Sequence, residues 1–474
     1  MKDILSCAPT TAASTASSSA IHPPCATEGQ LTLSESHDMQ RAISMESDPR
    51  SSLGAACREA AAAMAVRSSP AGAASPTWTW RWRDLVAQVC SVVYLLQAIF
   101  RRSMGRVRRP VCRQSQDVDL GILIASSLLE VPVSNTKLTI PLGLKVVGEV
   151  IKRLNSITRR SDGTINRALA DLLELKIAAC EKPTNGVSTR DVVIDEATNV
   201  WVRIFTPEIV RPGSNSSSEE KVPVMVYYHG GGFGVLCANM LFYDRIGRTL
   251  AKTCQMIVVS VNYRRAPEHK FPIAYDDSFQ ALEWLRSPAS ARHLPAVADV
   301  SRTFLCGDSA GGNIVHFMGC RAAEIDLSPV QIRGLIPLQP YLGSEARVPS
   351  EINLVNVPVI SVDATDWHWK AFLPEGADRD HPACNVFGPN AKDISGLNLP
   401  PMFVVVSTLD VLLDHQLHYV AKMQELGKDV TMKCYDGGIH GFYILEGVGI
   451  KLALTCIDDI HNFVQSCLLT VAAQ

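Results

Sequence analysis

The sequence predicts an α/β protein with a mostly parallel central sheet and helices on both faces of that sheet. From about residue 128 onward, strand-like segments alternate with helical ones, and the strand-like segments are nearly continuous apolar runs. Strands buried on both faces have this composition, whereas half-exposed strands alternate apolar and polar residues. The expected strands are 199–205, 222–228, 256–262, 303–306, 332–338, 401–407 and 430–435, and the expected helices lie near 165–178, 242–253, 275–287, 311–324 and 414–427.

The composition permits a large buried core and argues against a nucleic-acid partner. The chain has 474 residues, of which 47% are apolar and 19% charged, and its net charge of −2 gives no reason to expect a nucleic-acid partner. Its 14 cysteines are scattered and form no Cys-x-x-Cys pair, so no metal site or dense disulfide framework is expected. Buried free thiols in a reducing compartment are the simpler interpretation. We expect no cofactor and a cytoplasmic location, with the nucleus as an additional one.

Residues 1–125 differ from the rest and are interpreted as a poorly structured extension of a folded domain at 126–474. They include Ala- and Ser-rich stretches without periodicity, and residues 1–30 lack the apolar centre of a secretory signal. The apolar stretch 85–100 is short for a transmembrane helix and precedes an arginine cluster. Contact of residues 78–113 with an anionic membrane surface is the less favoured interpretation, and an extension without function is the favoured one. Residues 214–220 are predicted to form a polar loop.

The pentapeptide at 307–311 is Gly-Asp-Ser-Ala-Gly, and it carries the strongest functional signal. It lies directly between the predicted strand 303–306 and the predicted helix 311–324. This strand–turn–helix context is typical of a nucleophile elbow, in which a strained turn presents the serine and its neighbours must be small. Ser309 is therefore predicted to be a nucleophile. The alternative is a small residue at a structural turn.

Two further residues complete a predicted catalytic triad. Asp410 follows the strand 401–407, and His440 lies some 30 residues later within Gly-Gly-Ile-His-Gly-Phe. The chain order Ser, Asp, His is that of the α/β-hydrolase fold and differs from the order in other serine hydrolases. His440 would remove the proton of Ser309, and Asp410 would hold the imidazole tautomer. The alternatives are Asp414 in place of Asp410, or a role for His440 as a hydrogen-bonded loop residue.

A glycine run supplies the remaining part of such a site. The predicted strand 222–228 ends in His-Gly-Gly-Gly-Phe at 229–233. Backbone N–H groups in a glycine run after a strand can converge on one oxygen, which is how an oxyanion hole is built. We predict that the N–H groups of Gly231, Gly232 and Ala310 form this hole. His229 is expected to shape the loop rather than to transfer protons.

The segment 229–463 resembles plant carboxylesterases of the hormone-sensitive-lipase type, a group of α/β-hydrolases. Within that group the chain is similar to soluble gibberellin receptors from about residue 133 to its C-terminus, most clearly at 159–167, 185–187, 263–268 and 373–385. The resemblance implies an α/β-hydrolase fold with a helical N-terminal lid at about 128–160. In that lid we expect Leu142, Leu144, Val147 and Ile151 to cover the pocket. The predicted substrate-pocket residues are Phe233, Asp308, Trp367 and Tyr443.

The departures from the receptor pattern decide the predicted function. The resemblance implies that receptors replace the triad histidine by an aliphatic residue and usually carry serine at the position of Gly232, whereas this chain has His440 and Gly232. Residues 364–369 read Ala-Thr-Asp-Trp-His-Trp where receptors have Asp-Arg-Asp-Trp-Tyr-Trp, so a basic and a tyrosine side chain that would reach the hormone are missing. We predict a serine carboxylesterase acting on small-molecule esters. The alternative is a non-catalytic hormone receptor that recruits a growth repressor. A gibberellin-like ligand is expected to bind only weakly.

Overall fold

The computed structural model describes residues 130–132, 139–208, 221–444 and 450–472. The chain divides into two compact units, Met1–Val89 and Cys90–Gln474, and all of the described residues belong to the second. The predictions made for 1–125, 78–113 and 214–220 therefore lie outside the described residues.

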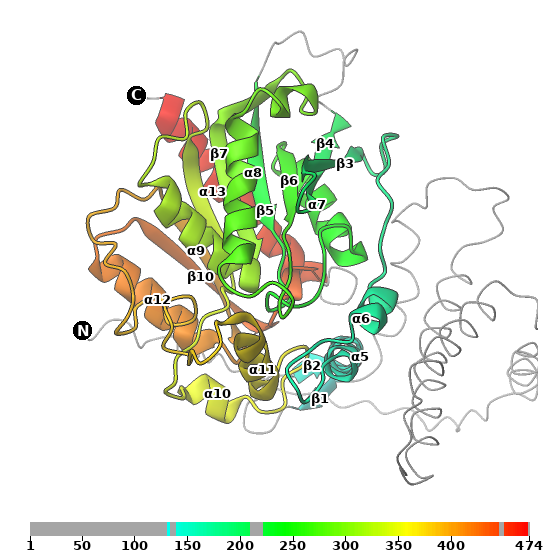
Figure 1. Cartoon of the computed structure of the whole chain (residues 1–474), viewed down its shortest axis with the longest axis vertical. Helices are drawn as coiled ribbons and strands as arrows, with labels where there is room; N and C mark the ends of the chain where they lie inside the picture. Colours follow the sequence, from blue (N-terminus) through cyan, green and yellow to red (C-terminus); the bar gives the residue numbers. More distant parts are fainter. Residues whose placement is uncertain (1–129, 133–138, 209–220, 445–449, 473–474) are drawn as a thin grey trace, which may run out of the picture. The chain divides into compact units, whose positions relative to one another are not determined.

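Eight strands form the central sheet in the order β10-β9-β8-β7-β5-β6-β4-β3 (Figure 1). Every pair from β10 to β6 is parallel, and β4 runs antiparallel to both β6 and β3, which confirms a mostly parallel sheet. The strands are β3 (Val187–Asp195), β4 (Val200–Pro207), β5 (Val222–Tyr228), β6 (Ile257–Asn262), β7 (Ala298–Asp308), β8 (Ile332–Leu338), β9 (Met402–Leu409) and β10 (Val430–Ile439).

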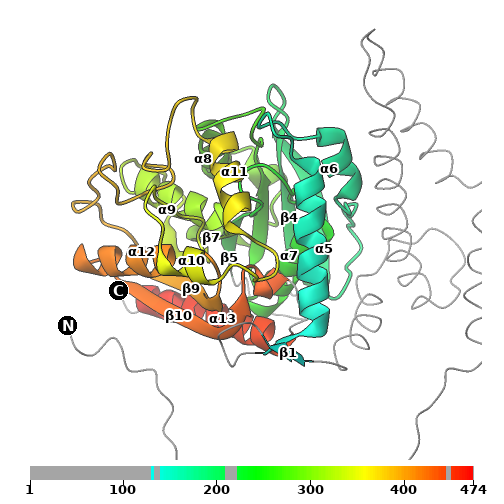
Figure 2. The same ribbon diagram turned by 90° about the horizontal axis from the view of Figure 1, so that it is seen from below.

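Helices cover both faces of this sheet, as predicted. On one face α7 (Leu241–Thr253) packs with α13 (Ile450–Ala472), and on the other lie α8 (Ile273–Arg286), α9 (Ala310–Ala322) and α12 (Leu413–Glu425) (Figures 1 and 2). The short helices α6 (Arg167–Leu173), α10 (Pro349–Asn353) and α11 (Val362–Phe372) belong to the connections. Single 3-10 turns stand at Ser290–Arg292 and Phe442–Ile444.

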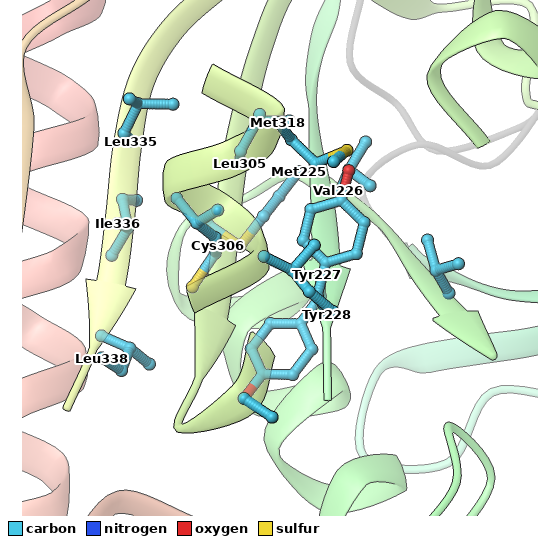
Figure 3. Packing of buried hydrophobic residues seen from close by; sticks show 14 of the residues in the cluster. Met225, Val226, Tyr227, Tyr228, Leu305, Cys306, Met318, Leu335, Ile336 and Leu338 are labelled. Atoms are coloured by element: carbon cyan, nitrogen blue, oxygen red, sulfur yellow. The ribbon is translucent and has the colours of Figure 1, made fainter. Parts of the chain in front are cut away.

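The core lies between the central strands and the helices that cover them. Six of the seven residues of β5 are buried, in keeping with its continuous apolar run. Figure 3 shows buried side chains of β5, β7 and β8 together with Met318 of α9. Burying one such aliphatic side chain contributes about 1.5–3 kcal/mol relative to leaving it exposed. This packing fixes the strand ends, and in an open parallel sheet the loops after the carboxyl ends form the functional site.

The differences from the predicted elements have local causes. Strand β3 was not predicted because it lies at the sheet edge, where its burial alternates and polar residues such as Arg190 and Asp191 are exposed. The helix predicted at 165–178 is only α6, because Glu174 turns extended and its carboxylate accepts the backbone N–H of Leu236 at 2.7 Å. The strands at 222–228 and 332–338 have the predicted bounds.

The segment predicted to be a helical lid contains one long helix. Helix α5 (Leu142–Thr158) follows a two-stranded antiparallel pair, β1 (Glu130–Pro132) and β2 (Thr139–Pro141), so the helical prediction holds only for the later part of 128–160. Ile151 is partly buried against the main core. The backbone N–H of Val359 donates to the carbonyl oxygen of Gly148 at 3.3 Å, which ties α5 to the loop before α11. The side chains of Leu142, Leu144 and Val147 are outside what the structure describes.

The cysteines agree only in part with the expectation of free thiols. Among the described residues, buried free thiols stand at Cys237, Cys254, Cys306, Cys320, Cys384, Cys456 and Cys467. Cys180 is the exception, because it is disulfide-bonded. Within the described ranges no group of His, Cys, Asp and Glu side chains could hold a metal ion. None of the described helices is both long and apolar enough to cross a membrane.

Candidate active site

The turn between β7 and α9 presents Ser309 in a strained conformation. Ser309 has φ 53° and ψ −115°, a left-handed backbone that L-residues rarely adopt, and it stands one residue before α9. Its N–H donates to the carbonyl oxygen of Leu338 at 2.9 Å, which anchors the turn to the end of β8. A Cβ on Gly311 would come within 1.9 Å of the Tyr228 carbonyl oxygen, so only glycine fits there. The predicted nucleophile elbow therefore has the required geometry.

The three predicted triad side chains meet, although their positions in the chain are 101 and 30 residues apart. His440 Nε2 lies 3.0 Å from Ser309 Oγ, and His440 Nδ1 lies 2.8 Å from Asp410 Oδ2. Because a buried carboxylate only accepts hydrogen bonds, Nδ1 carries the proton and Nε2 accepts from the serine hydroxyl. All three residues are buried. This arrangement can remove the serine proton as the hydroxyl attacks an electrophile.

Asp410, rather than Asp414, occupies the third position. Asp410 is completely buried, whereas the Asp414 carboxylate accepts the backbone N–H of Ser350 at 2.6 Å and ties α12 to α10. Besides His440, Asp410 Oδ2 accepts N–H groups of Gln339 and Gln416, at 2.9 and 3.0 Å. Its other oxygen accepts the backbone N–H of Leu412 at 3.0 Å. Four donors thus compensate the burial of its charge.

Electrostatics at His440 favour the imidazolium that forms during such a reaction. Burial alone would lower the pKa of His440, but the Asp410 carboxylate outweighs it and raises the pKa above the ordinary value of 6.5. The more distant carboxylate of Asp308 acts in the same direction. A histidine whose pKa is raised in this way accepts the serine proton more readily as the hydroxyl attacks.

The glycine loop after β5 is held from behind by a buried network. Asp308 Oδ1 accepts the Tyr227 hydroxyl at 2.9 Å and the Gly230 N–H at 3.0 Å, and its Oδ2 accepts the Tyr243 hydroxyl at 3.0 Å. Burial raises the pKa of Asp308 to about 6, against the opposing effect of these donors. A place for Asp308 in the substrate pocket stays a prediction. Both of its oxygens are occupied within the protein, and it supports the loop.

The predicted oxyanion donors lie on this loop and at the start of α9. Gly231 and Gly232 have φ of +102° and +56°, and the Gly231 carbonyl accepts the N–H groups of Gly234 and Val235, both at 3.0 Å. In the loops and turns that the structure describes, neither the Gly231 N–H nor the Gly232 N–H donates to a backbone carbonyl. Ala310 is the first residue of α9, where an N–H has no carbonyl of its own helix to bond.

The other predicted pocket residues have different surroundings. Phe233 has no exposed surface and stacks on Phe372 with ring centroids 3.8 Å apart, so it supports the glycine loop from within the core. Its place in a substrate pocket stays a prediction. Trp367 is partly exposed, and its indole N–H donates to the Arg160 carbonyl at 3.2 Å, which joins α11 to the segment after α5. Tyr443 is buried, and its hydroxyl donates to the Leu338 carbonyl at 3.3 Å, the same carbonyl that anchors Ser309.

Sequence reasoning missed two side chains that contact the triad or its loops. Gln339 contacts Asp410, and Tyr243 contacts the glycine loop. A signal for Gln339 existed, because it directly follows the predicted strand 332–338 and so stands at the same sheet edge as Ser309 and Asp410. No comparable signal marks Tyr243, which lies inside a helix.

Comparison with known proteins agrees with this geometry. The family model for the alpha/beta hydrolase fold matches residues 225–444. The chain is 41% identical over 343 residues to the gibberellin receptor GID1C of Arabidopsis thaliana, covering 71% of this chain and 98% of that protein. It is 34% identical over 318 residues to carboxylesterase 20 of the same plant, covering 66% of this chain and 96% of the relative.

Among solved structures, a hyperthermophilic esterase from the archaeon Pyrobaculum calidifontis matches with a TM-score of 0.54 and 23% identity. The match covers 68% of this chain and 97% of the esterase, and it supports the fold alone. The chain belongs to the α/β-hydrolase family, in the plant hormone-sensitive-lipase branch that includes gibberellin receptors and carboxylesterases.

Proposed function

We propose that the protein is a serine carboxylesterase that hydrolyses small carboxylic esters. The observation that carries this proposal is the unbroken chain of contacts from Ser309 Oγ through His440 to Asp410, at 3.0 and 2.8 Å. A histidine within hydrogen-bond reach of a serine on a strained elbow, itself oriented by a carboxylate, is the arrangement that activates a serine hydroxyl.

The reaction follows from the positions of these groups. Ser309 Oγ attacks the ester carbonyl carbon as His440 Nε2 takes its proton, and the carbonyl oxygen gains negative charge. The N–H groups of Gly231, Gly232 and Ala310 receive that charge in a site removed from bulk water. His440 then gives its proton to the departing alcohol, leaving an acyl group on Ser309. His440 then takes a proton from water as the water oxygen bonds to the acyl carbon. The bond from that carbon to Ser309 Oγ breaks, the acid leaves, and His440 returns the proton to Ser309 Oγ.

A second candidate function is gibberellin binding, and the similarity to a gibberellin receptor favours it. The chain retains His440 and Gly232, and the basic and tyrosine side chains expected to contact the hormone are replaced by Thr365 and His368. Each lost charge-assisted or polar contact weakens binding by about 1–3 kcal/mol. We therefore place esterase chemistry first and expect a dissociation constant for gibberellin above roughly 10 μM.

Two further features complete the proposal. We propose that α5 serves as a lid whose closure excludes water from Ser309 and limits which acyl groups enter. We also propose a cytoplasmic location, with the nucleus as an additional one, in keeping with the free thiols at the buried cysteines.

One paired experiment on the same purified full-length protein tests both candidates. Hydrolysis of short-chain p-nitrophenyl esters is measured beside gibberellin binding by calorimetry. Ester hydrolysis that falls at least ~10³-fold in kcat in Ser309→Ala supports the esterase, with binding weak or undetectable. Absent hydrolysis combined with a submicromolar dissociation constant would establish the receptor function instead.

A further inference from the structure

Gln339 connects Asp410 to the loop that carries His440 through a single buried amide. Its Nε2 donates to Asp410 Oδ2 at 2.9 Å and to Ser407 Oγ at 2.5 Å. Its Oε1 accepts the backbone N–H of Gly441, the residue after His440, at 2.7 Å. The side chain has no exposed surface. One amide therefore restrains the carboxylate and the histidine loop relative to each other.

The backbone of Gln339 is itself held in an uncommon conformation. Gln339 directly follows β8, between the ends of β7 and β9 that carry Ser309 and Asp410 (Figure 1). It has φ 42°, in the left-handed region, and its N–H donates to the Val405 carbonyl at 2.8 Å. Residues other than glycine persist in this region only where their surroundings over-determine them. The hydrogen bonds of the Gln339 amide nitrogen and oxygen hold the residue in this conformation.

We propose that Gln339 is a positioning residue of the triad, which fixes Asp410 against the His440 loop and limits the basicity of His440 by sharing Asp410 Oδ2. This inference rests on the proposed esterase function. Asp410 Oδ2 is the same atom that His440 Nδ1 contacts. An N–H that donates to this oxygen draws off part of the negative charge that otherwise stabilises the imidazolium.

Gln416 provides an internal comparison, because it donates to Asp410 as Gln339 does but lacks the contact with the His440 loop. Its Nε2 donates to the same Asp410 oxygen at 3.0 Å from α12, but its Oε1 has no hydrogen-bond partner among the described residues, those of the His440 loop included. Loss of the Gln416 donor should therefore raise the basicity of His440 without loosening its loop. Only Gln339 combines both effects.

The test compares Gln339→Met and Gln339→Glu with Gln416→Met in the full-length protein. Gln331→Met is the matched control, since Gln331 is exposed and lies just before the opposite end of β8. Two readouts are used: kcat and KM for a p-nitrophenyl ester across pH, and the His440 pKa from NMR of the imidazole. The NMR readout needs no catalysis, so it separates failure of this inference from failure of the esterase proposal.

In Gln339→Met we expect kcat to fall at least ~10-fold with KM within about 2-fold, because the loss lies in transition-state geometry. The His440 pKa should rise by at least roughly 0.5 pH unit. Gln339→Glu keeps the shape, and once ionised it places a second negative charge beside Asp410, so its His440 pKa should be higher still. Gln416→Met should raise the pKa with a smaller loss of kcat.

Two results would overturn the inference. One is an unchanged or lower His440 pKa in both Gln339 variants, which would reduce Gln339 to a packing role. The other is a Gln339→Met protein whose kcat and pKa match those of Gln331→Met. If Gln339→Met does not fold, the isosteric Gln339→Glu decides alone, and a His440 pKa at or below that of the wild type contradicts the proposal.

Discussion

Gly232 and His368 provide a direct perturbation of the proposed oxyanion hole. A Cβ built on Gly232 would lie 2.7 Å from His368 Cγ and 2.9 Å from its Nδ1, closer than real Cβ atoms approach other groups. His368 is buried on α11, and burial lowers its pKa to about 3, so the ring is neutral and packed inside the protein. We predict that Gly232→Ala displaces the glycine loop.

The magnitude has two parts. Gly232 has φ +56°, and a side chain in that left-handed region costs roughly 1–2 kcal/mol. Overpacking against the His368 ring adds about 1–3 kcal/mol. If the loop shifts to relieve the overlap, an oxyanion donor moves out of place, which lowers kcat by about 10²–10³. KM should change much less, because the donor acts mainly on the transition state.

The assay measures kcat, KM and the free energy of unfolding for Gly232→Ala, His368→Ala and the double variant. Removing the His368 ring relieves the steric part, so the double variant should recover at least ~10-fold in kcat over Gly232→Ala. Gly376→Ala is the matched control, because Gly376 has φ +81° and nothing within 4 Å of its built Cβ. It should lose stability with unchanged kcat. Full activity in Gly232→Ala, or no recovery in the double variant, would refute this reasoning.

Three further predictions concern the pH dependence, the network behind the glycine loop and residues 1–125. Asp410 raises the pKa of His440, and only neutral His440 can act as a base. We therefore expect kcat/KM to fall as the pH drops, with a midpoint above 6.5 in a pH–rate profile. A midpoint below 6 would contradict this prediction. Tyr243→Phe removes the hydroxyl between Asp308 and the glycine loop. It should lower the free energy of unfolding by about 1–3 kcal/mol in urea titrations and also reduce kcat. An unchanged kcat would show that this network does not affect catalysis. Deletion of residues 1–125 should leave ester hydrolysis within about 2-fold of that of the full chain, since the sequence indicates no role for them in the pocket. Loss of activity in a folded truncated protein would show that these residues contribute to catalysis.

The sheet and the three side chains that meet at Ser309 were predictable because their signals are local. Continuous apolar runs predict buried parallel strands, and Ser309, Asp410 and His440 each stand at a strand end in a recognisable order. The edge strand β3 and the long helix α13 were missed for different reasons. Polar residues interrupt β3, and α13 carries exposed Leu454 and Leu469 beside its buried face, which blurs the helical period.

The supporting contacts were not predictable because they join residues far apart in the chain. Asp308 contacts Tyr227 and Tyr243, which lie 81 and 65 positions away, and its adjacency to Ser309 gave no sign of these contacts. Gln339 and Gly441 are 102 positions apart. Such pairings depend on strand order and register, which the sequence pattern alone does not specify.

Covalent labelling of the nucleophile tests the proposed role of Ser309. An organophosphonate that reacts with activated serines is incubated with the full-length protein, and the modified peptide is located by mass spectrometry. We expect one adduct per chain, on Ser309, formed far more slowly in a folded His440→Ala protein because the base that activates the hydroxyl is gone. An unlabelled Ser309, or labelling whose rate does not depend on His440, would contradict the proposed triad.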